Sequence, residues 1–254
     1  YLPGGIAPDT ESTVSWLDRD GNVARAFDDL AAYGSVRLSP TGERLAYTTT
    51  GSNAGVWVRD LRRGVTTQLS DGQSSFAIWT RDGEHVTFDR VDSGVPNLYW
   101  RVADASRPAE PLATSDAVEF PAVWSADDRR LIYSHNGSRL SVLHVEEGRR
   151  EELFGHERPA MTPALSPDGR WLAYASFEAG SYQVFVRPFP GPGGADPDLG
   201  AGRSGPVMVS RWSRAVLSHP DRCAESTTLR DESGCGFGAD HGGGEPILRR
   251  HGSA

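Results

Sequence analysis

The sequence predicts an all-β protein, a β-propeller made of four-stranded antiparallel blades. Three observations predict this fold class. A short segment recurs four times, and consecutive copies lie 41, 45 and 41 residues apart. A repeat of about 40–45 residues is the length that one four-stranded blade needs. No stretch shows the 3.6-residue periodicity of an amphipathic helix. Each copy is centred on a Ser or Thr, namely Ser39, Thr80, Ser125 and Ser166.

Each repeat divides into four expected strands. The first is short and apolar and ends at a Leu or Trp just before the repeated Ser or Thr. A polar turn follows, in which Pro presets the backbone dihedral φ and Asp and Gly tolerate the bend. The second strand alternates apolar and polar residues, as Arg44-Leu45-Ala46-Tyr47 does. Third strands are expected at 56–58, 98–100, 140–142 and 183–186, and fourth strands at 66–69, 110–112 and 151–154.

The two ends of the chain depart from this pattern. Residues 13–23 are interpreted as the outer hairpin of a blade whose inner strands are missing or begin near Tyr1, and because the chain opens on Tyr we expect a piece of a longer product. A fifth repeat should begin near 207–211, but the polar turn and alternating strand are lacking there. We therefore expect propeller blades in residues 1–200, about four to five in an incomplete ring, and an atypical tail in residues 201–254.

The tail is expected to be disordered or the product of a one-nucleotide frameshift. Reading the codons one base later from Met208 permits a Trp-Ser-Pro-Asp-Gly sequence in register with the repeat. A segment translated in the wrong frame would carry no selected apolar pattern and could not build a core.

No catalytic, cofactor-binding or metal-binding residue is predicted. Aspartates recur at equivalent turn positions, which indicates a structural role in bonding neighbouring backbone amides; they are Asp82, Asp127, Asp128 and Asp168. Three further aspartates, Asp89, Asp92 and Asp104, are expected in solvated loops. No pair of histidines has zinc-ligand spacing with a third ligand, and His85 and His135 are assigned to packing or surface positions. Aromatic residues that recur at strand positions are expected between blades; they are Trp57, Trp79, Trp100, Trp124, Trp171, Tyr47, Tyr99, Tyr133 and Tyr174.

The repeats resemble the TolB-like, WD-repeat-like propeller family, whose repeat centres on a Ser-Pro-Asp-Gly turn. Residues 166–169 match that turn fully and the other three match in part, and the resemblance covers residues 1–194. The stretches YLPGG, TVSWLDRDG and YQVFVRPFPGPGG are similar to propellers fused to the C-terminal side of bacterial serine/threonine protein kinases. The resemblance implies six blades in the intact ring and an extracytoplasmic, periplasmic location, tethered through a preceding membrane segment; a cytoplasmic location stays open.

The resemblance implies a non-catalytic sensor or scaffold that binds a protein or small ligand. Propellers of this kind bind partners at the channel mouth or top loops, and loops 51–55, 92–97 and 178–181 vary in length between repeats. The chain contains no Gly-rich phosphate loop, HRD or DFG sequence, so kinase activity would lie elsewhere in a parent protein. Two alternatives stay open: the substrate-gating propeller of a prolyl-oligopeptidase-like hydrolase, or a stand-alone periplasmic scaffold like TolB.

Composition limits the partners. The net charge of −8, with basic residues scattered among acids, disfavours nucleic acid, which needs a concentrated basic face. No apolar run approaches the roughly 18 residues of a membrane span, so no membrane insertion by this segment is expected.

Overall fold

The computed structural model describes residues 12–17, 22–92, 94–153, 159–178, 181–191, 207–208 and 247–252. These residues form antiparallel sheets, with a single 3₁₀ turn, η1 (Gly51–Asn53), among them. The all-β prediction is therefore confirmed. Within the described ranges, no helix is long and apolar enough to cross a bilayer.

Four sheets contain four strands each, in the order in which the strands occur in the chain. We number the sheets blade I to blade V in chain order. Blade II contains β3 (Tyr33–Leu38), β4 (Arg44–Thr49), β5 (Gly55–Asp60) and β6 (Thr66–Asp71); blade III contains β7 (Ala77–Trp79), β8 (His85–Val91), β9 (Pro96–Val102) and β10 (Glu110–Ala113). Blade IV contains β11 (Glu119–Trp124), β12 (Arg130–His135), β13 (Arg139–His144) and β14 (Arg149–Glu152); blade V contains β15 (Met161–Leu165), β16 (Trp171–Glu178), β17 (Ser181–Pro188) and β18 (Val207–Met208).

Blade I joins strands from the two ends of the chain. Its order is β19-β1-β2, with β1 (Ser12–Leu17) and β2 (Val23–Arg25) as a hairpin and β19 (Ile247–Gly252) antiparallel to β1. The expected N-terminal hairpin is thus present, and its inner neighbour comes from the far end of the chain. Of the expected tail, the structure describes only β18 and β19; residues 201–206, 209–246 and 253–254 lie outside the described residues.

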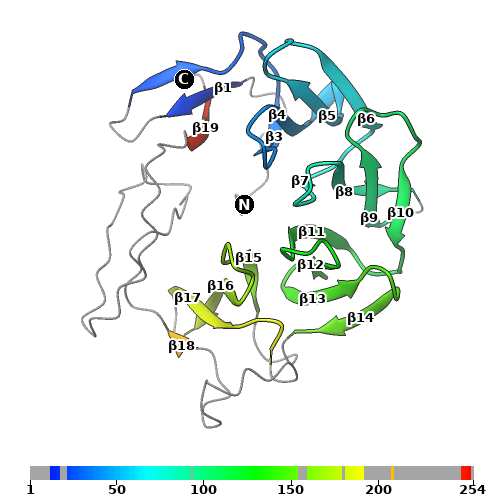
Figure 1. The fold of residues 1–254 in the computed structure, drawn as a ribbon, viewed down its shortest axis with the longest axis vertical. Helices are drawn as coiled ribbons and strands as arrows, with labels where there is room; N and C mark the ends of the chain where they lie inside the picture. The colour runs from blue at the N-terminus through cyan, green and yellow to red at the C-terminus, as the bar shows by residue number, and fades with distance from the viewer. Residues whose placement is uncertain are drawn as a thin grey trace.

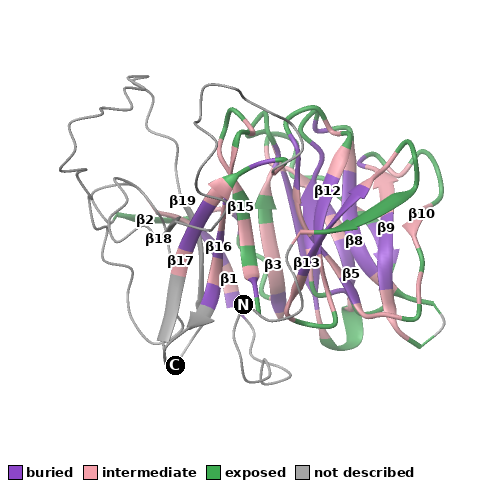
Figure 2. Ribbon diagram, turned by 90° about the horizontal axis from the view of Figure 1, so that it is seen from below, coloured by how far each residue is buried: buried purple, intermediate pink, exposed green. Residues whose placement is uncertain are grey.

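The sheets stand side by side around a common centre (Figure 1), and the first strands of successive blades, β3, β7, β11 and β15, contact one another. Buried residues lie along the strands, whereas exposed residues gather in the connections at the two ends of the blades (Figure 2). The fourth strand of blade IV begins two residues earlier than expected, because the tight turn closed by Gly148 N–H on the Val145 carbonyl lets pairing start at Arg149.

The core lies mainly between blades. Val56 and Val58 of blade II, for example, pack in one cluster with Trp79 and Phe88 of blade III. Burying one such side chain stabilises the fold by about 1.5–3 kcal/mol. Eight of the nine aromatic residues lie in clusters that join two blades, as predicted: Trp79, Trp124, Tyr47, Tyr99, Tyr133 and Tyr174 are buried, and Trp57 and Trp100 are half-buried. Trp171 is half-buried and belongs to none of the clusters of described residues.

Candidate functional site

Each blade presents two chemically different ends. Because neighbouring strands are antiparallel, the first-to-second and third-to-fourth connections lie at one end, which we call the turn end. The second-to-third connections and the links to the next blade lie at the other, the loop end. The three loops predicted to bind partners, 51–55, 92–97 and 178–181, all join second to third strands and so share the loop end. Residues 93, 179 and 180 of these loops are outside the described residues.

Hydrogen bonds within each turn dominate the turn end. In blade III, Asp82 Oδ1 accepts the Thr80 hydroxyl at 2.6 Å and the Glu84 N–H at 2.8 Å. Asp127 and Asp168 bond the corresponding hydroxyls and amides of their own turns. Hydrogen bonds, the strongest of them from the Ser125 hydroxyl, hold the pKa of Asp127 below its usual range. The Ser166 hydroxyl has the same leading effect on the pKa of Asp168. The structural interpretation of these three aspartates is therefore confirmed.

Asp128 has a different role from the other turn aspartates. It stands where the other turns have Gly42, Gly83 and Gly169, and its φ of 53° is in the left-handed region that those glycines also adopt. Its carboxylate accepts the Arg81 N–H at 2.6 Å and the Asp82 N–H at 2.9 Å. Asp128 thus bonds the turn of blade IV to the turn of blade III, a contact that sequence position alone did not reveal.

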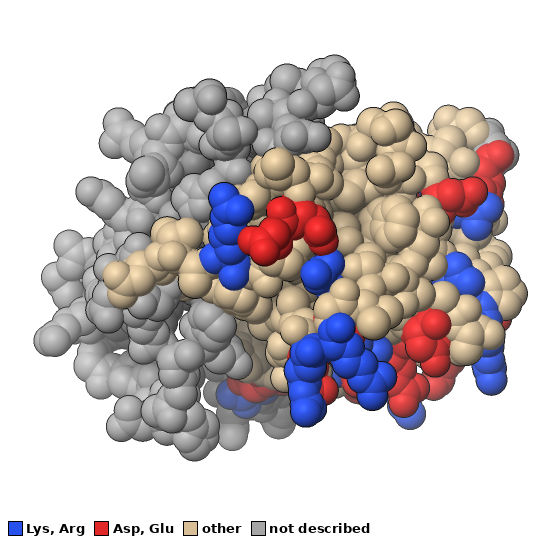
Figure 3. Space-filling model, turned by 90° about the horizontal axis from the view of Figure 1, so that it is seen from above, with Lys and Arg blue, Asp and Glu red and all other residues tan. Residues whose placement is uncertain are grey.

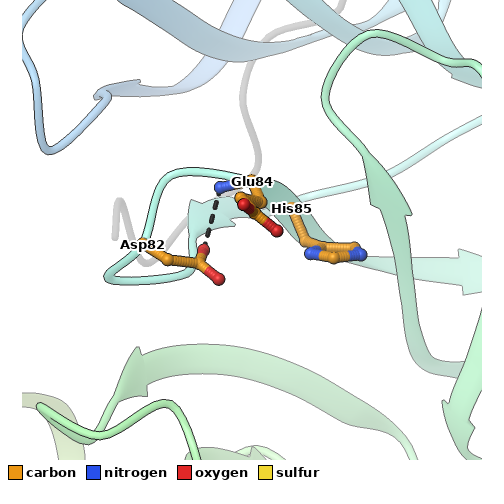
Figure 4. Close-up of side chains that lie close together, drawn as sticks. All are labelled: Asp82, Glu84 and His85. Atoms are coloured by element: carbon orange, nitrogen blue, oxygen red, sulfur yellow. Dashed lines mark hydrogen bonds between the residues drawn. The ribbon is translucent and has the colours of Figure 1, made fainter.

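One turn brings together three side chains that could bind a metal ion. Asp82, Glu84 and His85 each offer a ligand atom, and these atoms all lie within 4.8 Å of one another. Figure 4 shows the three side chains leaving one turn, with Glu84 between Asp82 and His85. Partial burial works against ionisation of Asp82, but its hydrogen bonds to Thr80 and Glu84 hold its pKa below the usual range. Sequence reasoning missed this group because it required two histidines with zinc-ligand spacing, although the run Asp-Gly-Glu-His was a local signal.

The loop end contains a buried aspartate, which corrects one prediction. Asp89 is not in a solvated loop: it lies in β8 and is 2 % exposed. Its carboxylate accepts the N–H groups of Ser75 and Phe76, at 3.0 and 2.8 Å, and the Ser74 hydroxyl at 3.2 Å. Burial raises the pKa of Asp89 to about 6, against the opposing effect of these hydrogen bonds. Asp92 and Asp104 are exposed, as expected.

A second buried carboxylate lies in blade IV. Glu119, at the start of β11, is 1 % exposed, pairs with Arg150 at 2.9 Å and accepts the Ser115 hydroxyl at 3.0 Å. Burial raises the pKa of Glu119, while Arg150 opposes the rise. Arg150 also donates to the Thr114 carbonyl, so this pair anchors the link between blades III and IV. Asp89 thus bonds the backbone of an inter-blade link directly, and Glu119 does so through Ser115 and Arg150.

Charges of both signs are interspersed on the outer surface. On the face shown in Figure 3, basic and acidic side chains lie next to each other, and the described residues include the ion pairs Arg25–Asp28, Arg59–Asp29 and Arg62–Glu43. The exposed pairs Arg25–Asp28 and Arg62–Glu43 contribute little to stability. The described part of this face has no continuous basic stripe of the kind that phosphate backbones bind.

Comparison with known proteins places this architecture among TolB-like propellers. The chain is similar to the solved structure of a putative TolB from Agrobacterium tumefaciens, with a TM-score of 0.61 and 17 % identity; the match covers 71 % of this chain and 67 % of that one. It is also similar to TolB from Acinetobacter baumannii, with a TM-score of 0.62 and 16 % identity; this match covers 84 % of this chain and 56 % of that one. A third similar structure is an S511A mutant of puromycin hydrolase complexed with PGG, with a TM-score of 0.53 and 17 % identity; the match covers 65 % of this chain and 28 % of that one. The chain has the TolB-like β-propeller fold.

Two curated proteins are similar in sequence. The uncharacterized peptidase YuxL of Bacillus subtilis is 24 % identical over 201 residues, 59 % of this chain and 30 % of YuxL. The Tol-Pal system protein TolB of Hahella chejuensis is 41 % identical over 49 residues, 19 % of this chain and 11 % of TolB. The chain thus spans less than a third of the curated relatives it matches. No family model matches the chain.

Proposed function

We propose that this chain is a non-catalytic binding module that engages a protein or small ligand at the loop end of its blades. The observation that carries the proposal is the contrast between the two blade ends. The turn end repeats the same hydrogen bonds from blade to blade. The loop end differs in each blade: the connections between the second and third strands, 50–54, 92–95, 136–138 and 179–180, differ in length and in sequence. A recognition surface needs such variety, and a scaffold needs such repetition.

The roles of the carboxylates support a binding function over a catalytic one. Asp82, Asp127 and Asp168 are held by backbone amides of their own turns, and Asp89 and Glu119 are buried in inter-blade links. A general acid or base must reach the proton that it transfers. The first four of these carboxylates bond backbone amides directly, and Glu119 contacts Ser115 and Arg150, which in turn bond the backbone of the link.

We further propose that the module is the propeller region of a bacterial serine/threonine kinase, exposed outside the cytoplasm. The stretches YLPGG, TVSWLDRDG and YQVFVRPFPGPGG support this parent. Sequencing the gene on both sides of the segment that encodes residues 1–254 tests it. A kinase domain upstream, followed by a membrane span, is the expected result. A hydrolase domain downstream with a G-x-S-x-G nucleophile turn would overturn it.

A second candidate is the propeller of a peptidase. The similarity to YuxL over 201 residues and the fold shared with puromycin hydrolase favour it. A stand-alone scaffold is a third, supported by the similarity to TolB. It predicts a signal peptide and a small N-terminal domain upstream, with neither a kinase nor a hydrolase domain in the gene.

Site-specific crosslinking tests where the partner binds. A photoreactive residue at Asn53 reports on the loop end of blade II, and one at Glu43, exposed in the same blade, reports on the turn end. In cells of the source organism carrying each variant of the full gene, we expect one defined adduct from the Asn53 position and none from Glu43. An adduct from Glu43 alone, or from neither position, would contradict a loop-end partner.

A further inference from the structure

The side chain of Asp82 is held in place by the turn before any ligand arrives. Both of its hydrogen bonds, from the Thr80 hydroxyl and the Glu84 N–H, end on Oδ1. Among the described residues no donor contacts Oδ2, which is left for another ligand. The backbone beneath is fixed in turn, because Asp128 of blade IV accepts the N–H groups of Arg81 and Asp82. A metal ligand that is oriented by its surroundings binds with a smaller loss of conformational freedom.

The other two side chains are available to a ligand. The His85 ring stacks on Trp100 with 4.5 Å between ring centroids and 22° between the planes. Stacking orients the ring but uses neither nitrogen, and within the described ranges no hydrogen bond reaches the ring nitrogens of His85 or the carboxylate of Glu84. Glu84 is exposed and His85 half-buried, so both can be reached from solvent.

The fold does not require a ligating residue at these positions. The residues equivalent to Glu84 are Glu43, Arg129 and Arg170, and those equivalent to His85 are Arg44, Arg130 and Trp171. The same turn therefore forms with arginine at either place. Of the four equivalent turns, only that of blade III combines Asp, Glu and His. Structural need accounts for Asp82, and stacking on Trp100 accounts for a ring at His85, but neither accounts for Glu84 or for the imidazole nitrogens of His85.

We propose that Asp82, Glu84 and His85 form a surface site for a divalent transition-metal ion such as Zn²⁺. One imidazole nitrogen with two carboxylate oxygens suits Zn²⁺ and its neighbours in the first transition row. Ca²⁺ instead takes about six to eight oxygen ligands, which this turn does not supply. In a tetrahedral Zn²⁺ site with bonds of about 2.0–2.2 Å, ligand atoms lie roughly 3.4 Å apart. The three ligand atoms are now up to 4.8 Å apart, and rotation of the exposed Glu84 side chain can shorten the distances from its carboxylate to the other two.

The site leaves at least one coordination position open. Three protein ligands complete only part of a four-coordinate sphere, and the remainder faces solvent at the turn end. A water molecule or a carboxylate or imidazole of another protein can occupy it. Because the site lies at the opposite blade end from the loop-end surface, it can be tested independently of the proposed function.

Calorimetric titration of the metal-free full chain with Zn²⁺ tests the proposal. Glu84→Arg and His85→Arg introduce the residues that blade IV has at these positions, so both variants should fold with unchanged circular dichroism and thermal unfolding. We expect each to bind Zn²⁺ at least about tenfold more weakly than the wild type. His144→Gln is the matched control, because His144 is already bonded to Glu151 and Arg149, and it should bind as the wild type does.

A spectroscopic readout locates the ion. Cu²⁺ bound to His85 should quench the fluorescence of the stacked Trp100, and His85→Arg should abolish that quenching while His144→Gln retains it. Millimolar Mg²⁺ or Ca²⁺ should not displace Zn²⁺. Equal Zn²⁺ binding by the wild type and both arginine variants would overturn the proposal. Equal loss in the His144→Gln control, or displacement by Ca²⁺, would also overturn it.

Discussion

Replacing Asp128 with Gly sets two opposing effects against each other. The left-handed φ of 53° costs a non-glycine residue about 1 kcal/mol, and Gly removes that cost. The substitution also removes two hydrogen bonds to a charged acceptor, from Arg81 N–H and Asp82 N–H. Such bonds contribute about 1.5–3 kcal/mol each when buried, and about 1 kcal/mol each at this half-exposed position. We therefore expect Asp128→Gly to lower the free energy of unfolding by about 1 kcal/mol.

Two companion variants separate the terms. Asp128→Ala loses both hydrogen bonds and keeps the φ cost, so we expect a loss of about 2 kcal/mol. Asp128→Asn keeps one acceptor oxygen and tolerates the left-handed region, so we expect about 1 kcal/mol. Urea unfolding measures all three, and hydrogen exchange should speed up at the Arg81 and Asp82 amides but not at Gly42, which bonds the Ser39 carbonyl. An Asp128→Gly protein as stable as the wild type would refute the inter-blade role.

Three further predictions concern the core and the loop end. Trp124→Phe removes the buried hydrogen bond from the indole N–H to the Thr87 hydroxyl and should cost about 1–3 kcal/mol by urea unfolding. Burial raises the pKa of Asp89 to about 6 from 3.8, so the folded state holds the proton more tightly than the unfolded state does. The free energy of unfolding should therefore fall by up to about 3 kcal/mol as the pH rises from about 4 to about 6. Asp89→Asn should flatten this dependence on pH. Gly34→Ala should lower the free energy of unfolding by about 1–3 kcal/mol in urea, because the new Cβ would overlap the Thr48 hydroxyl. Unchanged stability would mean that β3 and β4 can separate at this position.

Local signals were enough to predict most of the fold. The repeated Ser or Thr was identifiable because its hydroxyl accepts an N–H only five residues later, as Ser39 does from Arg44 and Ser166 does from Trp171. The Asp of the turn bonds an amide two residues later. Such contacts leave a recurring pattern in one stretch of sequence, so turns and second strands could be placed correctly from the residues alone.

Contacts between distant segments were not predictable in the same way. Asp89 was misplaced because its hydrogen-bond donors, Ser75 and Phe76, belong to the link that precedes its blade. Glu119 was not singled out, because its partner Arg150 lies in the fourth strand of the same blade. The pairing of β19 with β1 joins opposite ends of the chain and has no local signature at all. For Asp89 and Glu119, burial overrode the usual preference of a charged residue for solvent.

The two blade ends satisfy their backbone in different ways, which explains why the sequence repeat can be recognised at the turn end only. At the turn end, the side chains of one turn satisfy the backbone of that turn in the same way in blades II to V, with Thr41 in place of the carboxylate in blade II and Asp128 in place of the glycine in blade IV. At the loop end the chain must cross from an outer strand to the next inner strand, and the residues at this end make different contacts: Thr48 accepts the N–H of Ser35 in the neighbouring strand, whereas Asp89 accepts the N–H groups of Ser75 and Phe76 in the link between blades II and III. The connections between second and third strands also differ in length, so a ligand that binds across several of them meets different chemistry in each blade. One that binds at the turn end meets the same backbone turn in these blades, with different side chains at the positions of Glu84 and His85.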